Sequence, residues 1–182
     1  MQDHVKQVLL RLEKTRKQFW NIPPESGNLL NLIIKASGYK DILEIGTSNG
    51  YSTIWFAEAA EKNAGHVTGI EFYPERIDLA LKNFEDCKLS EYITVKQGKA
   101  LDIIQTFDSK FDFVFIDANK SEYIKYFEIM HPKLRSKGMI VADNVTSHKE
   151  SVQNFLDAIT EHPEYQMSYL PFDGGLLLAL KQ

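Results

Sequence analysis

Acidic residues stand at or near the carboxyl ends of four short apolar runs: Glu44, Glu71, Asp117 and Asp143. Charged residues are depleted inside buried strands because their desolvation costs free energy. Each acid alone is as compatible with a helix N-cap or a solvated loop as with function. If the runs are parallel strands of one sheet, however, all four acids lie along the rim where such sheets bind ligands. The row therefore predicts a ligand or metal site.

The stretch 41–53, DILEIGTSNGYST, has the pattern of a strand, a turn and a helix. Gly46 permits a sharp turn and a close approach to a ligand. Glu44 is well placed to accept hydrogen bonds from a nucleoside-type cofactor, although backbone donors of its own turn are the alternative partners. A nicotinamide fingerprint would need glycines where Ser48 and Tyr51 stand, so this pattern disfavours an NAD-dependent oxidoreductase.

The position of Glu71, 25 residues after Gly46, is about where nucleotide-binding sheets place the carboxylate that takes both ribose hydroxyls. The turn also carries three hydroxyls, from Thr47, Ser48 and Ser52, which suit a small anion such as an amino-acid carboxylate. A cofactor with a ribose, an amino-acid tail and no phosphate is S-adenosylmethionine.

A second set of polar residues comprises Asp117, Lys120, Asp143 and Asn144. Two carboxylates and an amide oxygen from neighbouring strand ends suit Mg²⁺. A lysine beside a divalent cation can have its pKa lowered and work as a base, whereas an ordinary solvated lysine is the alternative. No histidine pair has the spacing of a zinc site. The five histidines are scattered: His4, His66, His131, His148 and His162.

The elements that would position these residues alternate in type, which predicts β-α-β units, a parallel sheet and helices on both of its faces. The expected strands are 41–46, 66–71, 92–96, 111–117 and 138–143, and the expected helices are 51–62, 74–88, 99–106, 121–135 and 148–160. Two further helices, 3–20 and 25–37, should precede the sheet. The stiff apolar linker between them either serves packing alone or covers the ligand. Residues 165–170 and 176–180 flank PFDGG and predict an antiparallel hairpin at one sheet edge.

Composition favours one soluble α/β domain over 1–182, with helices in 1–38 covering a sheet core in 39–182. The net charge of -4 argues against a general polyanion binder. The one cysteine, Cys87, is expected in the core. The first residues lack a signal-peptide pattern and no run reaches transmembrane length, so we expect a cytoplasmic protein without membrane contact.

Four segments, LEIGTSNGYS, GIE, IDANK and ADNV, resemble the class I S-adenosylmethionine-dependent methyltransferases, and within them the metal-dependent catechol and caffeoyl-CoA O-methyltransferase group. The resemblance runs from about residue 21 to residue 145. It implies a Rossmann-like seven-stranded sheet of order 3-2-1-4-5-7-6 with strand 7 antiparallel. It also implies methyl transfer to a hydroxyl of a small vicinal diol.

The resemblance further implies a role for individual residues. The cofactor-binding residues would be Ile22, Glu44, Gly46, Ser52, Glu71, Ala100 and Asp117. The ligands of Mg²⁺ or a similar cation would be Asp117, Asp143 and Asn144, with Lys120 as the general base. Trp20 could form a wall of the acceptor pocket. Asn119 replaces an acid that is common in the group, and the short N-terminal part suggests a pocket that is open or completed by a second subunit, so we expect a homodimer.

Two rival interpretations remain. In one, the acceptor is a hydroxyuridine of tRNA, bound by basic clusters at 14–17 or 133–137, although such clusters are more often solvated helix ends. In the other, the protein binds S-adenosylmethionine without turnover. The presence of Lys120 and of all three metal positions speaks against this second interpretation.

Overall fold

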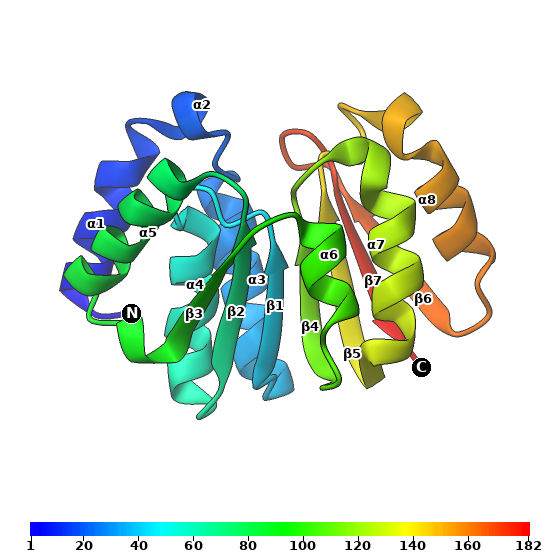
Figure 1. Ribbon diagram of the computed structural model, residues 1–182, viewed down its shortest axis with the longest axis horizontal. Coiled ribbons are helices and arrows are strands. Elements are labelled where there is room, and N and C mark those ends of the chain that lie inside the picture. Colours follow the sequence, from blue (N-terminus) through cyan, green and yellow to red (C-terminus); the bar gives the residue numbers. More distant parts are fainter.

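The computed structural model describes residues 1–182 and contains one seven-stranded sheet between two layers of helices (Figure 1). The spatial order of the strands is β3-β2-β1-β4-β5-β7-β6. The strands are β1 (Asp41–Ile45), β2 (His66–Glu71), β3 (Ile93–Gln97), β4 (Phe111–Ile116), β5 (Leu134–Asp143), β6 (Tyr165–Leu170) and β7 (Leu176–Lys181). This order, with β7 antiparallel to both of its neighbours, confirms the fold that the resemblance implied.

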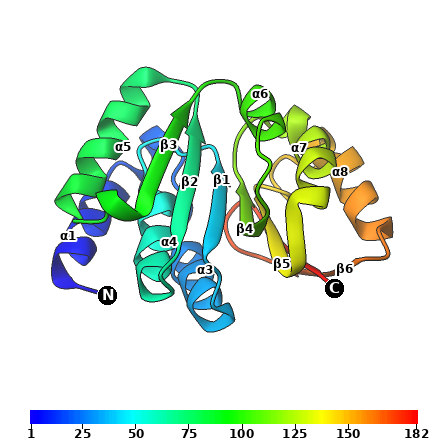
Figure 2. The ribbon, with the colours of Figure 1, turned by 60° about the horizontal axis from the view of Figure 1, so that its bottom comes forward.

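The α-helices are α1 (Asp3–Glu13), α2 (Arg16–Phe19), α3 (Pro24–Ser37), α4 (Tyr51–Lys62), α5 (Pro74–Asp86), α6 (Ala100–Gln105), α7 (Tyr123–Met130) and α8 (Lys149–Glu161). Three short 3₁₀ turns complete the chain: η1 (Ser90–Tyr92), η2 (Lys120–Glu122) and η3 (His131–Lys133). Helices α1, α3, α4 and α5 cover one face of the sheet, and α6, α7 and α8 cover the other (Figure 2).

The central strands are apolar because both of their faces are covered by helices. In β1, every residue from Ile42 to Ile45 is buried, and its neighbour β4 is buried from Phe113 to Ile116. The side chains of β1 and β4 alternate between the two cores on either side of the sheet. Because the five strands β1 to β5 are parallel, their carboxyl ends lie at one edge, where all the loops that carry the predicted site residues meet.

The expected helix 3–20 is interrupted in the structure. Helix α1 ends at Glu13, and both the backbone nitrogen and the Oγ1 of Thr15 donate to the carbonyl of Leu12, each at 3.1 Å. Helix α2 is then a single turn that ends at Phe19 and is followed by Trp20, whose φ of 53° is left-handed. A local hydroxyl competes with the helical ladder here, which hydrophobic periodicity alone does not reveal.

The predicted end of the helix 121–135 and the predicted start of the strand 138–143 were also wrong. Helix α7 stops at Met130, because Pro132 has no N–H to donate to a continuing helix. Strand β5 begins at Leu134, which pairs with Phe111, and not at 138. The register of the two strands shifts between this pair and the next one, Phe113 with Met139, so β5 contains a bulge or irregularity there.

The apolar stripe of α1 packs within the chain. Val5, Val8, Leu9 and Leu12 are buried, and the helix lies against α4 and α5. Cys87 is buried as expected, and burial raises the pKa of its thiol to about 12. None of the helices is both long and apolar enough to cross a membrane.

Candidate active site

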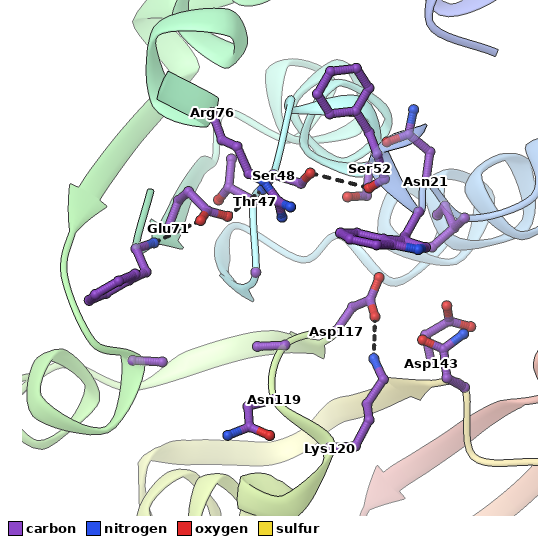
Figure 3. Close-up of a pocket in the computed structure, with 18 of the residues that line it drawn as sticks. Asn21, Thr47, Ser48, Ser52, Glu71, Arg76, Asp117, Asn119, Lys120 and Asp143 are labelled. Atoms are coloured by element: carbon purple, nitrogen blue, oxygen red, sulfur yellow. Dashed lines mark hydrogen bonds and ion pairs between the residues drawn. The ribbon is translucent and has the colours of Figure 1, made fainter. Parts of the chain in front are cut away.

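A cleft of about 1170 Å³ opens at the carboxyl ends of the parallel strands. Its walls come from the glycine turn after β1, the ends of β2, β4 and β5, the start of α6, the N-terminal segment 16–23 and the hairpin turn between β6 and β7. Figure 3 shows Glu71 on one side of this cleft and Lys120 and Asp143 on the other, with Asp117 between them. The fold therefore gathers three of the four acids predicted from the sequence, Glu71, Asp117 and Asp143, into one cavity.

The turn after β1 brings the backbone of two strands unusually close together. Gly46 has a φ of +105°, and a Cβ at this position would stand 2.2 Å from the carbonyl oxygen of Asp117. A larger residue would therefore clash with the end of β4 and adopt a strained conformation. Glycine is needed here for strand contact as well as for access to a ligand.

Glu71 is anchored by backbone donors at the end of β2. Its Oε1 accepts from the amides of Phe72 and Tyr73, each at 2.9 Å, and its Oε2 accepts from the amide of Ser48 at 2.8 Å. The side chain is 6% exposed and lines the cleft. Because Oε2 has only one protein donor, it retains acceptor capacity for a ligand hydroxyl.

Glu44 lies beneath the turn, outside the lining of the cleft. Its carboxylate accepts from the hydroxyls of Ser52, at 2.5 Å, and Thr53. Burial raises the pKa of this carboxyl to about 8, although the two hydroxyl donors oppose the shift. Ser52, which donates to Glu44, does line the cleft, and the expected contact of Glu44 with a cofactor stays a prediction.

Lys120 is held at the centre of the second group. Its ammonium donates to Asp117 Oδ1 at 2.7 Å, drawn as a dashed line in Figure 3, and to the hydroxyl of Tyr123 at 3.0 Å. The Tyr123 hydroxyl lies 3.1 Å from two carbonyl oxygens, those of Ile116 at the end of β4 and Asp143 at the end of β5. Tyr123 was not predicted as a site residue, although its spacing of three from Lys120 on a helical turn is the signal that could have found it.

Asp143 is the most unusual acid of the cleft. It is 3% exposed, and its Oδ1 has no hydrogen-bond partner. Burial and the negative charge of Asp117 raise the pKa of Asp143 to about 7, partly offset by the backbone N–H of Asn144. Asn144 has a left-handed φ of 62° and also lines the cleft. Asp117, Asp143 and Asn144 thus line the same cleft, where a buried oxygen of Asp143 lacks a donor.

The N-terminal segment 16–23 forms another wall of the cleft. Ile22 is buried and lines the cavity. Trp20 also lines it, although it is 72% exposed, and its ring centroid lies 5.3 Å from the guanidinium of Arg76. Arg16, which was not predicted, donates through Nε to the carbonyl of Asn21 and through a terminal nitrogen to Asp173 Oδ2 at 2.6 Å. This ion pair links the N-terminal segment to the hairpin turn across the cavity.

The remaining predicted residues also lie where the strand ends meet. Ala100 begins α6 and lines the cleft. Asn119 accepts from the backbone and side chain of Ser121 and thereby caps η2, so its amide has a local structural role. Further lining residues, not predicted from the sequence, are Lys17, Tyr73, Arg76, Tyr126 and His148.

Comparison with known proteins agrees with this geometry. A family model described as "O-methyltransferase" matches residues 2–182. The chain belongs to the O-methyltransferase family. Among its relatives, a catechol O-methyltransferase of Niastella koreensis is 38% identical over 69% of this chain and 58% of that protein. A catechol O-methyltransferase of Mycobacterium tuberculosis is 34% identical over 68% of this chain and 56% of that protein.

The chain thus aligns with a little over half the length of these two relatives. A caffeoyl-CoA O-methyltransferase of Populus trichocarpa is 26% identical over 91% of this chain and 78% of that protein. Among solved structures, an O-methyltransferase of Bacillus cereus in complex with SAH superposes with a TM-score of 0.87 at 27% identity, covering 100% of this chain and 92% of that one.

Proposed function

We propose that this protein is an S-adenosylmethionine-dependent O-methyltransferase that acts on one hydroxyl of a small vicinal diol such as catechol, with a divalent cation and with Lys120 as general base. The observation that carries the proposal is the convergence of Lys120, Asp117 and the unpartnered Oδ1 of Asp143 beside a large cleft. The catechol O-methyltransferases among its relatives, and the SAH complex of a structural neighbour, support the choice of reaction.

The cofactor would occupy the half of the cleft around Gly46 and Glu71. Glu71, with acceptor capacity left on Oε2, takes ribose hydroxyls, and Ser52 stands beside the amino-acid part. Ile22 and Ala100 close this half with apolar contacts. S-adenosylmethionine supplies the methyl group on a positively charged sulfur that an acceptor oxygen can attack.

The other half of the cleft fits a divalent metal. Its candidate ligands Asp117, Asp143 and Asn144 are all oxygen donors, the set that Mg²⁺ prefers. The buried, unpartnered Oδ1 of Asp143 is explained if a cation is its missing partner. A cation bound there would act as a Lewis acid that makes an acceptor hydroxyl easier to deprotonate.

Lys120, as the neutral amine, takes the proton of the acceptor hydroxyl at Nζ and thereby becomes the ammonium that pairs with Asp117. Asp117 and the Tyr123 hydroxyl each contact this nitrogen and fix its position. The N-terminal segment, joined to the hairpin turn by Arg16 and Asp173, covers the acceptor and limits its motion relative to the cofactor. Holding the reacting atoms at attack distance is the largest contribution expected from the protein.

The test is transfer of labelled methyl from S-adenosylmethionine to catechol, with Mg²⁺ and again with EDTA. We expect transfer that EDTA abolishes. Lys120→Ala should abolish turnover and leave cofactor affinity nearly unchanged, whereas Lys125→Ala, an exposed lysine outside the cleft, should behave as the wild type. Loss of cofactor binding in Lys120→Ala would show that this lysine is structural.

The metal ligands can be tested without turnover. Calorimetric titration of Mg²⁺ into the protein should give binding that Asp143→Asn weakens at least tenfold, and equal binding by both proteins would remove Asp143 from the ligand set. The proposed homodimer is tested by light scattering after gel filtration.

The tRNA alternative has less support in the structure. In the cluster 133–137, Arg135 pairs with Asp41 and Asp112, and Lys133 donates to backbone carbonyls. In the cluster 14–17, Arg16 is paired with Asp173. Steeply salt-dependent tRNA binding together with inactivity on catechol would favour this alternative. Binding of S-adenosylmethionine without any transfer would favour a non-catalytic protein.

A further inference from the structure

Three residues with metal-binding side chains meet at the end of the sheet opposite the cleft. They are His131, His162 and Glu164, and one donor atom from each lies within 4.8 Å of the others. The two imidazole rings have centroids 4.4 Å apart. Strand β5 separates this group from Asp143 by ten residues, or about 30 Å at the usual rise of a strand. The group is therefore independent of the cleft.

The backbone presents these residues from three short segments. His131 begins η3 after α7, His162 follows the end of α8, and Glu164 directly precedes β6. Each histidine is followed by a proline, Pro132 or Pro163, whose ring fixes one backbone dihedral. The restricted backbone beside each histidine lowers the conformational entropy that is lost when the two side chains converge on a ligand.

The hydrogen bonds of His131 leave one ring nitrogen free. Its Nδ1 lies 3.0 Å from the hydroxyl of Tyr165, so its Nε2 is the nitrogen available to a ligand. Metal-bound histidines commonly have such a partner on the second nitrogen, which fixes the tautomer and the ring orientation.

His162 and Glu164 are held by longer hydrogen bonds and ion pairs than His131 is. The backbone amide of Glu164 donates to Nδ1 of His162 at 3.3 Å, and this long bond is lost if Nε2 takes a metal and Nδ1 carries the proton. The ammonium of Lys181 lies 3.5 Å from the Glu164 carboxylate, but it also donates to the carbonyls of His131 and Leu134. Lys181 therefore keeps partners when Glu164 turns toward a cation, although its charge weakens cation binding.

We propose that His131, His162 and Glu164 form a site for Zn²⁺ or a similar first-row transition metal. Two imidazole nitrogens and one carboxylate oxygen are a ligand set that zinc accepts, with water in the remaining position. This set differs from the all-oxygen set of the cleft, which suits Mg²⁺. A metal bound here joins η3, the end of α8 and the start of β6, and so stabilises the folded chain at the sheet edge.

The experiment is calorimetric titration of Zn²⁺ into the full-length protein in excess Mg²⁺, together with thermal unfolding with and without Zn²⁺. We expect one Zn²⁺ per chain and a higher unfolding temperature. His162→Gln should weaken binding at least tenfold. Glu164→Gln, a change at an exposed side chain that leaves the fold intact, should also weaken it, and Lys181→Gln should tighten it.

His66→Gln is the matched control, because His66 bonds to Thr94 and lies outside the group. It should bind Zn²⁺ as the wild type does. A second measurement is the visible absorption of bound Co²⁺, whose intensity should fall in Glu164→Gln. The proposal is overturned if the wild type shows neither binding nor a thermal shift, or if His66→Gln reduces binding as much as His162→Gln.

Discussion

The most quantitative prediction concerns Glu44, whose carboxyl is 0% exposed. Its pKa is raised by burial from 4.5 to about 8. Because the folded-state pKa exceeds the unfolded value, stability from this group is fully present below about pH 4.5 and is lost as pH rises through 8. At about 1.36 kcal/mol per pKa unit, the loss reaches at most about 5 kcal/mol.

Glu44→Gln removes the titration and keeps the size of the side chain. The free energy of unfolding in urea, measured without cofactor between pH 4.5 and 8.5, should fall less steeply for the variant than for the wild type. Taking the difference between the two proteins at each pH removes the contribution of other groups, including Asp143. A difference that stays constant across this range would contradict the assignment of a raised pKa to Glu44.

Three further predictions concern residues that position the candidate site. Gly46→Ala should lower the free energy of unfolding in urea by at least about 3 kcal/mol, because the new methyl group adds a clash to backbone strain. Gly38→Ala is the control: Gly38 has a φ of +68° and open space around it, so the loss should be only about 1 kcal/mol. Tyr123→Phe should lower kcat about tenfold without changing cofactor affinity, because Lys120 loses a positioning contact; an unchanged kcat would contradict this role. Arg16→Gln removes an exposed ion pair worth about 1 kcal/mol or less. The KM for the acceptor should therefore rise no more than about fivefold at low salt. A much larger rise would mean that Arg16 binds the acceptor.

Local patterns were sufficient to predict a parallel α/β sheet with a terminal hairpin, whereas the order of the strands came from the resemblance to a known family. Strands β1 and β4 are continuous apolar runs because helices cover both of their faces, so each appears in the sequence as a short block ended by a polar residue. The acids at the strand ends could be placed on one rim because parallel strands share a direction. Element ends were less well predicted where a local interaction competed with periodicity, as at Thr15 and Pro132.

Contacts between distant segments were not predictable in the same way. The pairing of Arg16 with Asp173 joins residues 157 positions apart, and neither residue belongs to a recognisable motif. Glu44 was expected to bind the cofactor, and the structure places its carboxylate beneath the turn, where it accepts from the hydroxyls of Ser52 and Thr53 in α4. Linear spacing says which strand end carries a side chain, but not which side of the turn that side chain occupies.

The sequence by itself determined the fold class, the edge of the sheet that carries the candidate site, and the acids and lysine at that edge. These features depend on the periodicity and direction of neighbouring elements. Only the tertiary structure decided the burial that raises the pKa values of Glu44 and Asp143, the position of Tyr123 under Lys120, and the approach of His131 to His162. The two histidines appear scattered along the chain, and they meet because α7 and α8 pack side by side on the same face of the sheet. Burial and long-range proximity are properties of the packed chain, and no local spacing encodes them.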